Sequence, residues 1–257
     1  MVINVVQLGM VDYATATRLQ QTLVDLRKQG RIADTLLLLE HPPVITLGRN
    51  ATRKNVVASD EQMRRASIEI FECDRGGDVT YHGPGQLVGY PIFDLRDRAK
   101  RMGAVDYVRH IEEVLIRTCA DFGVAAKRIA GRTGVWTFDP EAKLAAIGVH
   151  ISRGVTSHGF ALNVSTDLDQ FKLIVPCGIS DRPVMSLHTA IAALDPGRAT
   201  PALDQVAEVV VRNFGKVFES QILWVDTLDA LVGRAVGVPL KEPAGLRAMH
   251  GDDTPWA

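Results

Sequence analysis

Hydrophobic and polar positions along this chain recur with two periods, one typical of β-strands and one typical of amphipathic helices. Short apolar or alternating runs, each bounded by turn-forming residues, predict nine strands. They cover residues 2–9, 35–40, 41–49, 67–72, 87–95, 133–138, 143–152, 154–164 and 221–225. These runs include the leucines at 36–39, which predict a strand buried on both faces.

The helical period appears first after Asp12, where Leu19, Leu23 and Leu26 share one face and Gly30 suits the end. Further helices are predicted over residues 105–122 and 186–194, and a last one is capped by Thr200. Strands come in runs as well as in alternation with helices. This order predicts a single α+β domain with a central mixed β-sheet flanked by helices.

Composition narrows the class of protein without identifying it. The 257 residues are 46% hydrophobic and 23% charged, which allows a sizeable core in one large domain or two small ones. A net charge of −1 gives no global field for nucleic acid or an anionic membrane. With no signal-peptide pattern and no run long enough to cross a bilayer, we expect a cytoplasmic protein.

The segment RGGDVTYHGPGQ, residues 75–86, carries four glycines between two strand-like runs. It matches neither GxxxxGK[ST] nor GxGxxG, and a strand rather than a helix follows it, so a phosphate site at a helix N-terminus is not expected. A flexible hairpin needs one or two glycines. The additional glycines favour a loop shaped to lie along a ligand. Within it, His82 fits a functional and a structural role equally well.

The three cysteines form neither a disulfide framework nor a zinc pattern. Cys119 falls on an apolar helix face and Cys73 ends a strand, so both are expected in or near the core. Cys177, between Pro176 and Gly178, fits either a structural role or a nucleophile. Lys143 begins an apolar strand and is either its solvated end or a general base. The seven histidines form no close ligand pair, so no metal site is expected.

Four motifs in order resemble the lipoyl(octanoyl) transferases, the bacterial LipB family. They are RGGDVTYHGPGQLVGYPI at 75–92, GRTGVWT at 131–137, KLAAIGVHISRGVTSHGFALNV at 143–164 and IVPCGI at 174–179. The resemblance runs from about residue 2 to 218. It implies a catalytic domain over residues 1–225 with the biotin/lipoate protein ligase fold, followed by an extension of unknown role over residues 226–257.

The resemblance also implies an activity, which is transfer of an octanoyl group from octanoyl-acyl carrier protein to a lysine of lipoyl domains. These domains belong to 2-oxoacid dehydrogenase E2 subunits and the glycine cleavage H protein. By position, Cys177 is the acyl-thioester nucleophile and Lys143 the base that lowers its pKa. The implied enzyme is a monomer that needs no cofactor and no metal. The implied substrate-binding residues are Arg75, Gly76, Gly77, Asp78, Val79, Thr80, Tyr81, His82, Ala146, Ile147, Gly148, Gly159, Phe160 and Ala161.

Three alternatives remain open at this point. An ATP-dependent lipoate or biotin ligase shares the fold but activates a free acid and needs no thiol. A non-catalytic binder of lipoyl domains forms no covalent adduct. A cysteine hydrolase needs a histidine paired with Cys177, for which His150 or His158 are the candidates.

Overall fold

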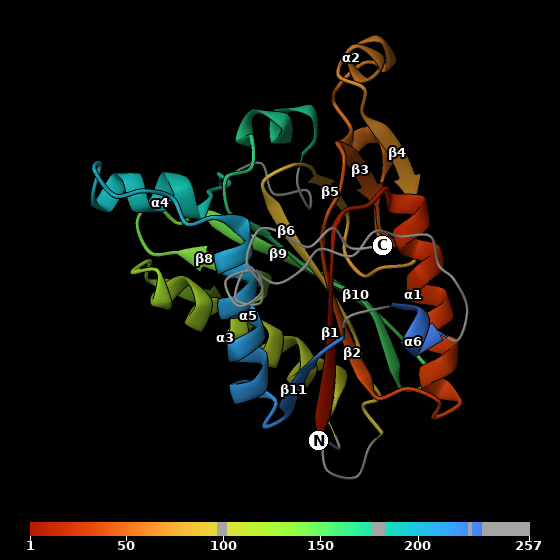
Figure 1. The fold of residues 1–257 in the computed structure, drawn as a ribbon. Helices are drawn as coiled ribbons and strands as arrows, with labels where there is room; N and C mark the ends of the chain where they lie inside the picture. Colours follow the sequence, from red (N-terminus) through yellow and green to blue (C-terminus); the bar gives the residue numbers. More distant parts are fainter. Residues whose placement is uncertain (97–101, 176–182, 226–227, 233–257) are drawn as a thin grey trace, which may run out of the picture.

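The structure, a computed structural model, describes residues 1–96, 102–175, 183–225 and 228–232. A large β-sheet carries helices on both faces, and a small sheet lies at one end of it (Figure 1). The large sheet has eight strands in the order β11-β1-β2-β6-β10-β9-β8-β7, and the small one has three in the order β4-β3-β5. Both sheets are mixed, because parallel pairs occur at β11, β1 and β2 and again between β3 and β4.

The strands of the large sheet are β1 (Val2–Met10), β2 (Asp34–Glu40), β6 (Gln86–Ile92), β7 (Ala126–Ile129), β8 (Arg132–Thr137), β9 (Lys143–Ser152), β10 (Val155–Asn163) and β11 (Gln221–Trp224). Those of the small sheet are β3 (Val44–Leu47), β4 (Glu69–Glu72) and β5 (Val79–His82). The helices are α1 (Tyr13–Lys28), α2 (Asp60–Arg65), α3 (Ala104–Asp121), α4 (Leu187–Leu194), α5 (Leu203–Val217) and α6 (Leu228–Val232), with 3₁₀ turns at Arg53–Asn55 and Leu168–Leu173.

The run of leucines in β2 shows how the sheet separates two hydrophobic clusters. Leu36 and Leu38 pack in the cluster that includes α3 and α5, whereas Leu37 and Leu39 pack in the cluster that includes α1. Successive side chains of a strand point to opposite faces, so a strand covered on both sides reads as an unbroken apolar run. The predicted α+β class with a central mixed sheet and flanking helices is confirmed.

Most of the predicted elements are present, and their end signals act as expected. The Asp12 carboxylate accepts a hydrogen bond from the Thr15 backbone N–H at 2.8 Å, and α1 ends before Gly30, whose φ is +69°. The predicted cap at Thr200 is wrong, since α5 begins at Leu203 with Ala202 at its N-cap. The Thr200 hydroxyl is instead hydrogen-bonded to Nδ1 of His188, which takes it away from the helix end.

The predicted boundary between a catalytic domain and an extension at residue 226 stays a prediction. Leu228 of α6, just inside the predicted extension, is buried in the cluster on the α1 face. Beyond residue 232 the chain lies outside the described residues. None of the helices in the described ranges is long and apolar enough to cross a membrane.

Candidate active site

The glycine-rich segment folds back onto β9, and it contains a strand as well as a loop. The Gly76 backbone N–H donates to the Val149 carbonyl oxygen at 2.9 Å, which fixes the loop against the sheet. A side chain at Gly148 would bring its Cβ within 2.7 Å of the Gly76 carbonyl oxygen, so glycine there permits the contact. After Gly77, at φ +90°, the chain continues as β5, which pairs with β3. Reading the whole segment as a loop was therefore wrong at residues 79–82.

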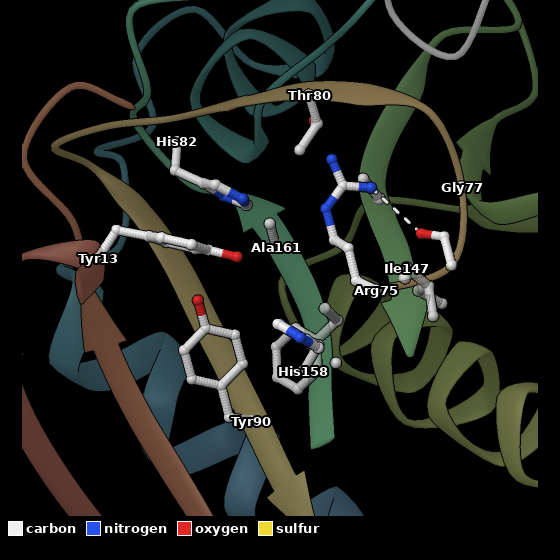
Figure 2. Close-up of a pocket in the computed structure, with 14 residues that line it drawn as sticks. Tyr13, Arg75, Gly77, Thr80, His82, Tyr90, Ile147, His158 and Ala161 are labelled. Atoms are coloured by element: carbon white, nitrogen blue, oxygen red, sulfur yellow. Dashed lines mark hydrogen bonds between the residues drawn. The ribbon is translucent and has the colours of Figure 1, made fainter. Parts of the chain in front are cut away.

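A pocket lies between this segment and the middle of β9 and β10; we call it the central pocket (Figure 2). It holds about 470 Å³ of space, including open solvent at its mouth. Eleven of the fourteen predicted substrate-binding residues line it, together with three residues outside that predicted set. The eleven are Arg75, Gly76, Gly77, Thr80, His82, Ala146, Ile147, Gly148, Gly159, Phe160 and Ala161, and the other three are Tyr13, Tyr90 and His158.

The three predicted residues that do not line the central pocket are Asp78, Val79 and Tyr81. In β5 successive side chains alternate between faces, so Thr80 and His82 face the pocket while Val79 and Tyr81 join the core beneath the small sheet. A carboxylate oxygen of Asp78 accepts a hydrogen bond from the Asn55 side chain. The family motif is contiguous in sequence, but the strand period divides it between a pocket wall and a core.

Arg75 places a buried guanidinium at the central pocket. Its side chain donates to the Thr46 hydroxyl and carbonyl oxygens at 2.7–3.1 Å and to the Gly76 carbonyl at 3.1 Å. The residue is 8% exposed, and no carboxylate pairs with it among the described residues. A buried charge that meets only neutral dipoles remains poorly compensated. The guanidinium is therefore available to an anion or a polarised carbonyl in the pocket.

The neighbouring imidazoles do not add charge at neutral pH. Burial, followed by the proximity of His41, lowers the pKa of His82 to about 3, and its Nδ1 lies 2.8 Å from the Gln86 side-chain oxygen. Burial also lowers the pKa of His41 to about 4. Because His41 Nδ1 donates to the Val11 carbonyl at 2.6 Å, its Nε2 accepts from the Tyr90 hydroxyl at 2.7 Å.

The three lining residues outside the predicted substrate-binding set come from elements far apart in sequence. Tyr13 begins α1 and stacks on His82 with ring centroids 6.3 Å apart. Tyr90 lies in β6 and His158 in β10, with their rings nearly perpendicular at 6.3 Å. Tyr90 and His158 fall inside the motifs at residues 75–92 and 143–164. Tyr90 is a polar side chain in an apolar run, which was a usable signal, whereas His158 follows the polar residues Thr156 and Ser157. Tyr13 carries no comparable signal, because a tyrosine at a helix start is common on a surface.

Lys143 begins β9, three residues before the pocket wall at Ala146. Its Nζ lies over the Trp136 ring, 5.1 Å from the ring centroid, in cation–π geometry. A Cβ at Gly134 would lie 2.9 Å from Cε of Lys143, so the glycine leaves room for the side chain. The backbone of Lys143 is fixed as well, since its N–H donates to the Pro183 carbonyl and its carbonyl accepts from Met185, both at 2.9 Å.

Cys177 lies in residues 176–182, outside the described residues. The chain on either side is held by backbone hydrogen bonds, at Val175 to Asn55 (2.7 Å) and at Pro183 to Lys143. The pairing of Cys177 with Lys143, or with a histidine as in a hydrolase, is therefore not tested. Cys119 is fully buried in the core as expected, and burial raises its pKa to about 12, while Cys73 is partly buried.

His150 and His158, the histidines considered for a hydrolase, both face Asp74. His158 Nε2 lies 2.7 Å from one Asp74 carboxylate oxygen, and His150 Nε2 lies 3.6 Å from the other. In the described part of the chain, no three His, Cys, Asp or Glu side chains gather in a way that could hold a metal ion.

Comparison with solved structures shows which fold this arrangement shares. A putative lipoate protein ligase from T. acidophilum with bound lipoic acid superposes with a TM-score of 0.67 at 15% identity, covering 91% of this chain and 93% of the other. A lipoate-protein ligase A bound with ATP gives 0.67 at 16% identity, covering 92% and 95%. At such identity these likenesses show the fold alone, and they confirm the predicted lipoate ligase fold.

Comparison of sequences shows the family. The model of the lipoyl protein ligase A/B catalytic domain matches residues 12–215. An octanoyltransferase of Koribacter versatilis is 59% identical over 252 residues, 98% of each chain. Another, from Acidobacterium capsulatum, is 59% identical over 236 residues, 88% of this chain and 94% of its own. The chain therefore belongs to the lipoyl protein ligase A/B family and, within it, to the lipoyl(octanoyl) transferases.

Proposed function

We propose that this acyltransferase moves an octanoyl group from octanoyl-acyl carrier protein to a lysine of lipoyl domains, with Cys177 as the acyl carrier. We take the acceptors to be lipoyl domains of 2-oxoacid dehydrogenase E2 subunits and the glycine cleavage H protein. The observation that supports this most strongly is the central pocket, because it gathers the glycine-rich segment, β9 and β10 beside Lys143. The 59% identity to octanoyltransferases supports the acyl group.

The walls of the central pocket suit an acyl chain with one polar end. Ile147, Phe160 and Ala161 offer apolar surface, and Arg75 offers a cation to the carbonyl oxygen. Burial contributes about 0.8 kcal/mol per methylene, so the seven carbons beyond the carbonyl contribute about 5–6 kcal/mol at most. This binding term is large enough to hold the chain while the thioester is exchanged.

The proposed reaction has two balanced steps. In the first, the Lys143 amine takes the Cys177 thiol proton, and the thiolate sulfur attacks the donor carbonyl. The new C–S bond forms as the bond to the carrier sulfur breaks, and the carrier leaves as a thiol with that proton. In the second, the acceptor lysine amine attacks the Cys177 thioester. An amide forms, Lys143 transfers the amine proton, and the Cys177 thiol is restored.

Since the donor is a thioester, neither step needs ATP, which separates this proposal from a ligase. We expect intact-mass analysis after incubation with octanoyl-acyl carrier protein to show one added octanoyl group, which a lipoyl domain then removes. Free octanoate with ATP should add nothing and support no transfer. A non-catalytic binder would show no adduct with either donor.

The matched variants are Cys177→Ser and Cys73→Ser, because Cys73 is another thiol that is not fully buried. The adduct should disappear in the first and persist in the second. An adduct of equal yield on Cys177→Ser would remove Cys177 from the mechanism. In the same assay, Lys143→Met should move the alkylation of Cys177 by iodoacetamide to higher pH, and an unchanged profile would contradict the base role.

A further inference from the structure

A second pocket lies between α1 and the far ends of β9 and β10; we call it the α1 pocket. It holds about 720 Å³ including open solvent, and exposed residues of α1 at its rim, Gln21 and Asp25, connect it with the surface. Its lining is polar, in contrast to that of the central pocket. It includes Thr17, Gln20, Asp74, His150, Ser152 and Ser157.

His158 is the residue that borders both pockets, and among the described residues it alone appears in both linings. Its side chain is 5% exposed, so the imidazole fills the space between them. Figure 2 shows this ring at the edge of the central pocket, next to Tyr90. The imidazole is therefore a partition rather than part of an open surface.

Three contacts hold this partition in place. The His158 Nε2 lies 2.7 Å from the Asp74 carboxylate, and its backbone N–H donates to the Gln20 side-chain oxygen at 2.7 Å. The Tyr90 ring packs against it edge to face. The backbone of His158 has φ +54°, a conformation that disfavours most side chains. The hydrogen bond to Asp74 and the contact with Tyr90 fix the direction of the imidazole.

The strand register places His158 at the distal end of the acyl site. From Lys143, β9 passes the central pocket at Ala146 to Gly148, and the next residue, Val149, pairs with His158. Ala146 lies three residues before Val149, a span of about 10 Å along the strand. An extended eight-carbon chain spans about 9 Å, given carbon–carbon bonds of about 1.5 Å. A chain whose carbonyl lies beside Ala146, where the wall of the central pocket begins, therefore ends in front of the His158 ring.

The groups behind the partition do not favour an alkyl chain. The Gln20 side-chain nitrogen and His150 Nδ1 are buried there without a hydrogen-bond partner among the described residues. Such groups take up water, and methylenes that displaced it would leave them unsatisfied. A longer chain thus meets a ring that blocks it and a polar space beyond.

We propose that His158 sets the upper limit of acyl-chain length, because it closes the central pocket against the α1 pocket. This inference rests on the proposed octanoyl transfer. His158 is a specificity-determining residue here, and it takes no part in the acyl exchange itself.

The test compares kcat/KM for dodecanoyl- and octanoyl-acyl carrier protein with a lipoyl domain as acceptor. His158→Gly removes the ring and suits the positive φ. It should raise the ratio of dodecanoyl to octanoyl transfer at least about tenfold, the discrimination that one or two methylenes supply in a tight pocket. His158→Asn, which tolerates the same φ and has a shorter side chain, should give a smaller rise and serves if the glycine variant does not fold.

Two control variants make the result specific to His158. His150→Ala enlarges the α1 pocket but leaves the partition intact, so the ratio should stay at the wild-type value. Tyr13 borders a third pocket, next to Cys73, and Tyr13→Leu tests whether the chain runs that way. An unchanged ratio in both His158 variants, or a rise in Tyr13→Leu alone, would overturn the inference. Failure of the wild type to transfer octanoyl would instead overturn the proposed function.

Discussion

Arg75 and Glu112 are both buried charged residues, but their charges are compensated to different extents within the protein. Glu112 of α3 is fully buried and lies 2.6 Å from the Arg109 guanidinium and 3.1 Å from that of Arg128. Its other oxygen accepts from the Gly134 backbone N–H at 3.1 Å. Within the described part of the chain, Arg75 donates only to neutral oxygens, those of Thr46 and Gly76.

The difference indicates which charge serves the fold and which serves a ligand. The charge of a buried carboxylate between two guanidiniums is compensated within the protein, so it does not need a ligand. The contacts of Glu112 link α3 to β7 and β8. A buried guanidinium without a carboxylate partner has an uncompensated positive charge, which can interact with an oxygen of a ligand. From this we expect substitutions at Arg75 to affect transfer and substitutions at Glu112 to affect folding.

The largest effect is expected at Arg75. Arg75→Met should lower kcat/KM for octanoyl transfer about 10²–10³-fold, the usual loss when one preorganised donor to a reacting oxygen is removed. The unfolding free energy should fall by only about 1–2 kcal/mol, from the oxygens of Thr46 left without a donor. Arg75→Lys should recover part of the rate because it restores the charge.

Arg49 is the matched control, since it is exposed and its backbone N–H donates to the Arg75 carbonyl oxygen. Arg49→Met removes a positive charge from the same part of the chain and should leave transfer near the wild-type rate. If Arg75→Met lost stability as steeply as activity, the guanidinium would be structural and the contrast with Glu112 would fail.

A smaller effect, on stability, is expected at Glu112. Glu112→Gln keeps an acceptor for the Gly134 N–H but removes the charge that both arginines meet. The unfolding free energy should fall by about 2–3 kcal/mol, near the low end for a broken buried pair because both arginines are partly exposed. Chemical denaturation measures the change. An equal loss in Glu113→Gln, whose carboxylate is about one-third exposed, would show that burial is not the cause.

Local patterns predicted the elements whose causes are local. A few neighbouring residues are enough to predict the apolar face of α1, the Asp12 cap and the buried strand formed by the leucines of β2. β5 was missed because its four residues, Val79–His82, stand between glycines that indicate a loop. The prediction of a helix cap at Thr200 failed because the Thr200 hydroxyl is hydrogen-bonded to His188, twelve residues away. Such competition is invisible in a short window.

The candidate site also has a part that could be predicted from the sequence and a part that could not. The motif segments that line the central pocket could be read from the sequence through a resemblance. The contacts that determine the protonation and the orientation of the pocket residues join residues far apart in the sequence. The periodicity of hydrophobic positions does not predict such contacts. His41 meets Tyr90 across 49 positions, and Asp74 meets His158 across 84. The pairing of β1 with β11 spans most of the chain. These contacts form only when the strands assemble into the sheet.

The smallest effect concerns the neutral state of His82, on which the isolation of the Arg75 charge depends. In the folded protein the pKa of His82 is about 3, against about 6.5 for an unperturbed histidine. As pH falls below about 6.5, the unfolded chain binds a proton that the folded protein does not, so stability falls with pH throughout this window. Above it the folded state loses nothing from this group.

One such proton gives a slope of about 1.4 kcal/mol per pH unit. His82→Gln should therefore lower the slope of unfolding free energy against pH between pH 6 and pH 4 by about this amount, whatever its effect at neutral pH. His41→Asn should act alike, but over a window that ends near pH 4, the pKa of His41. Denaturant titrations at half-unit pH intervals resolve such slopes. If both variants kept the wild-type slope, the histidines would be protonated in the folded protein below about pH 6.5, and in that range Arg75 would share the positive charge of the central pocket with them.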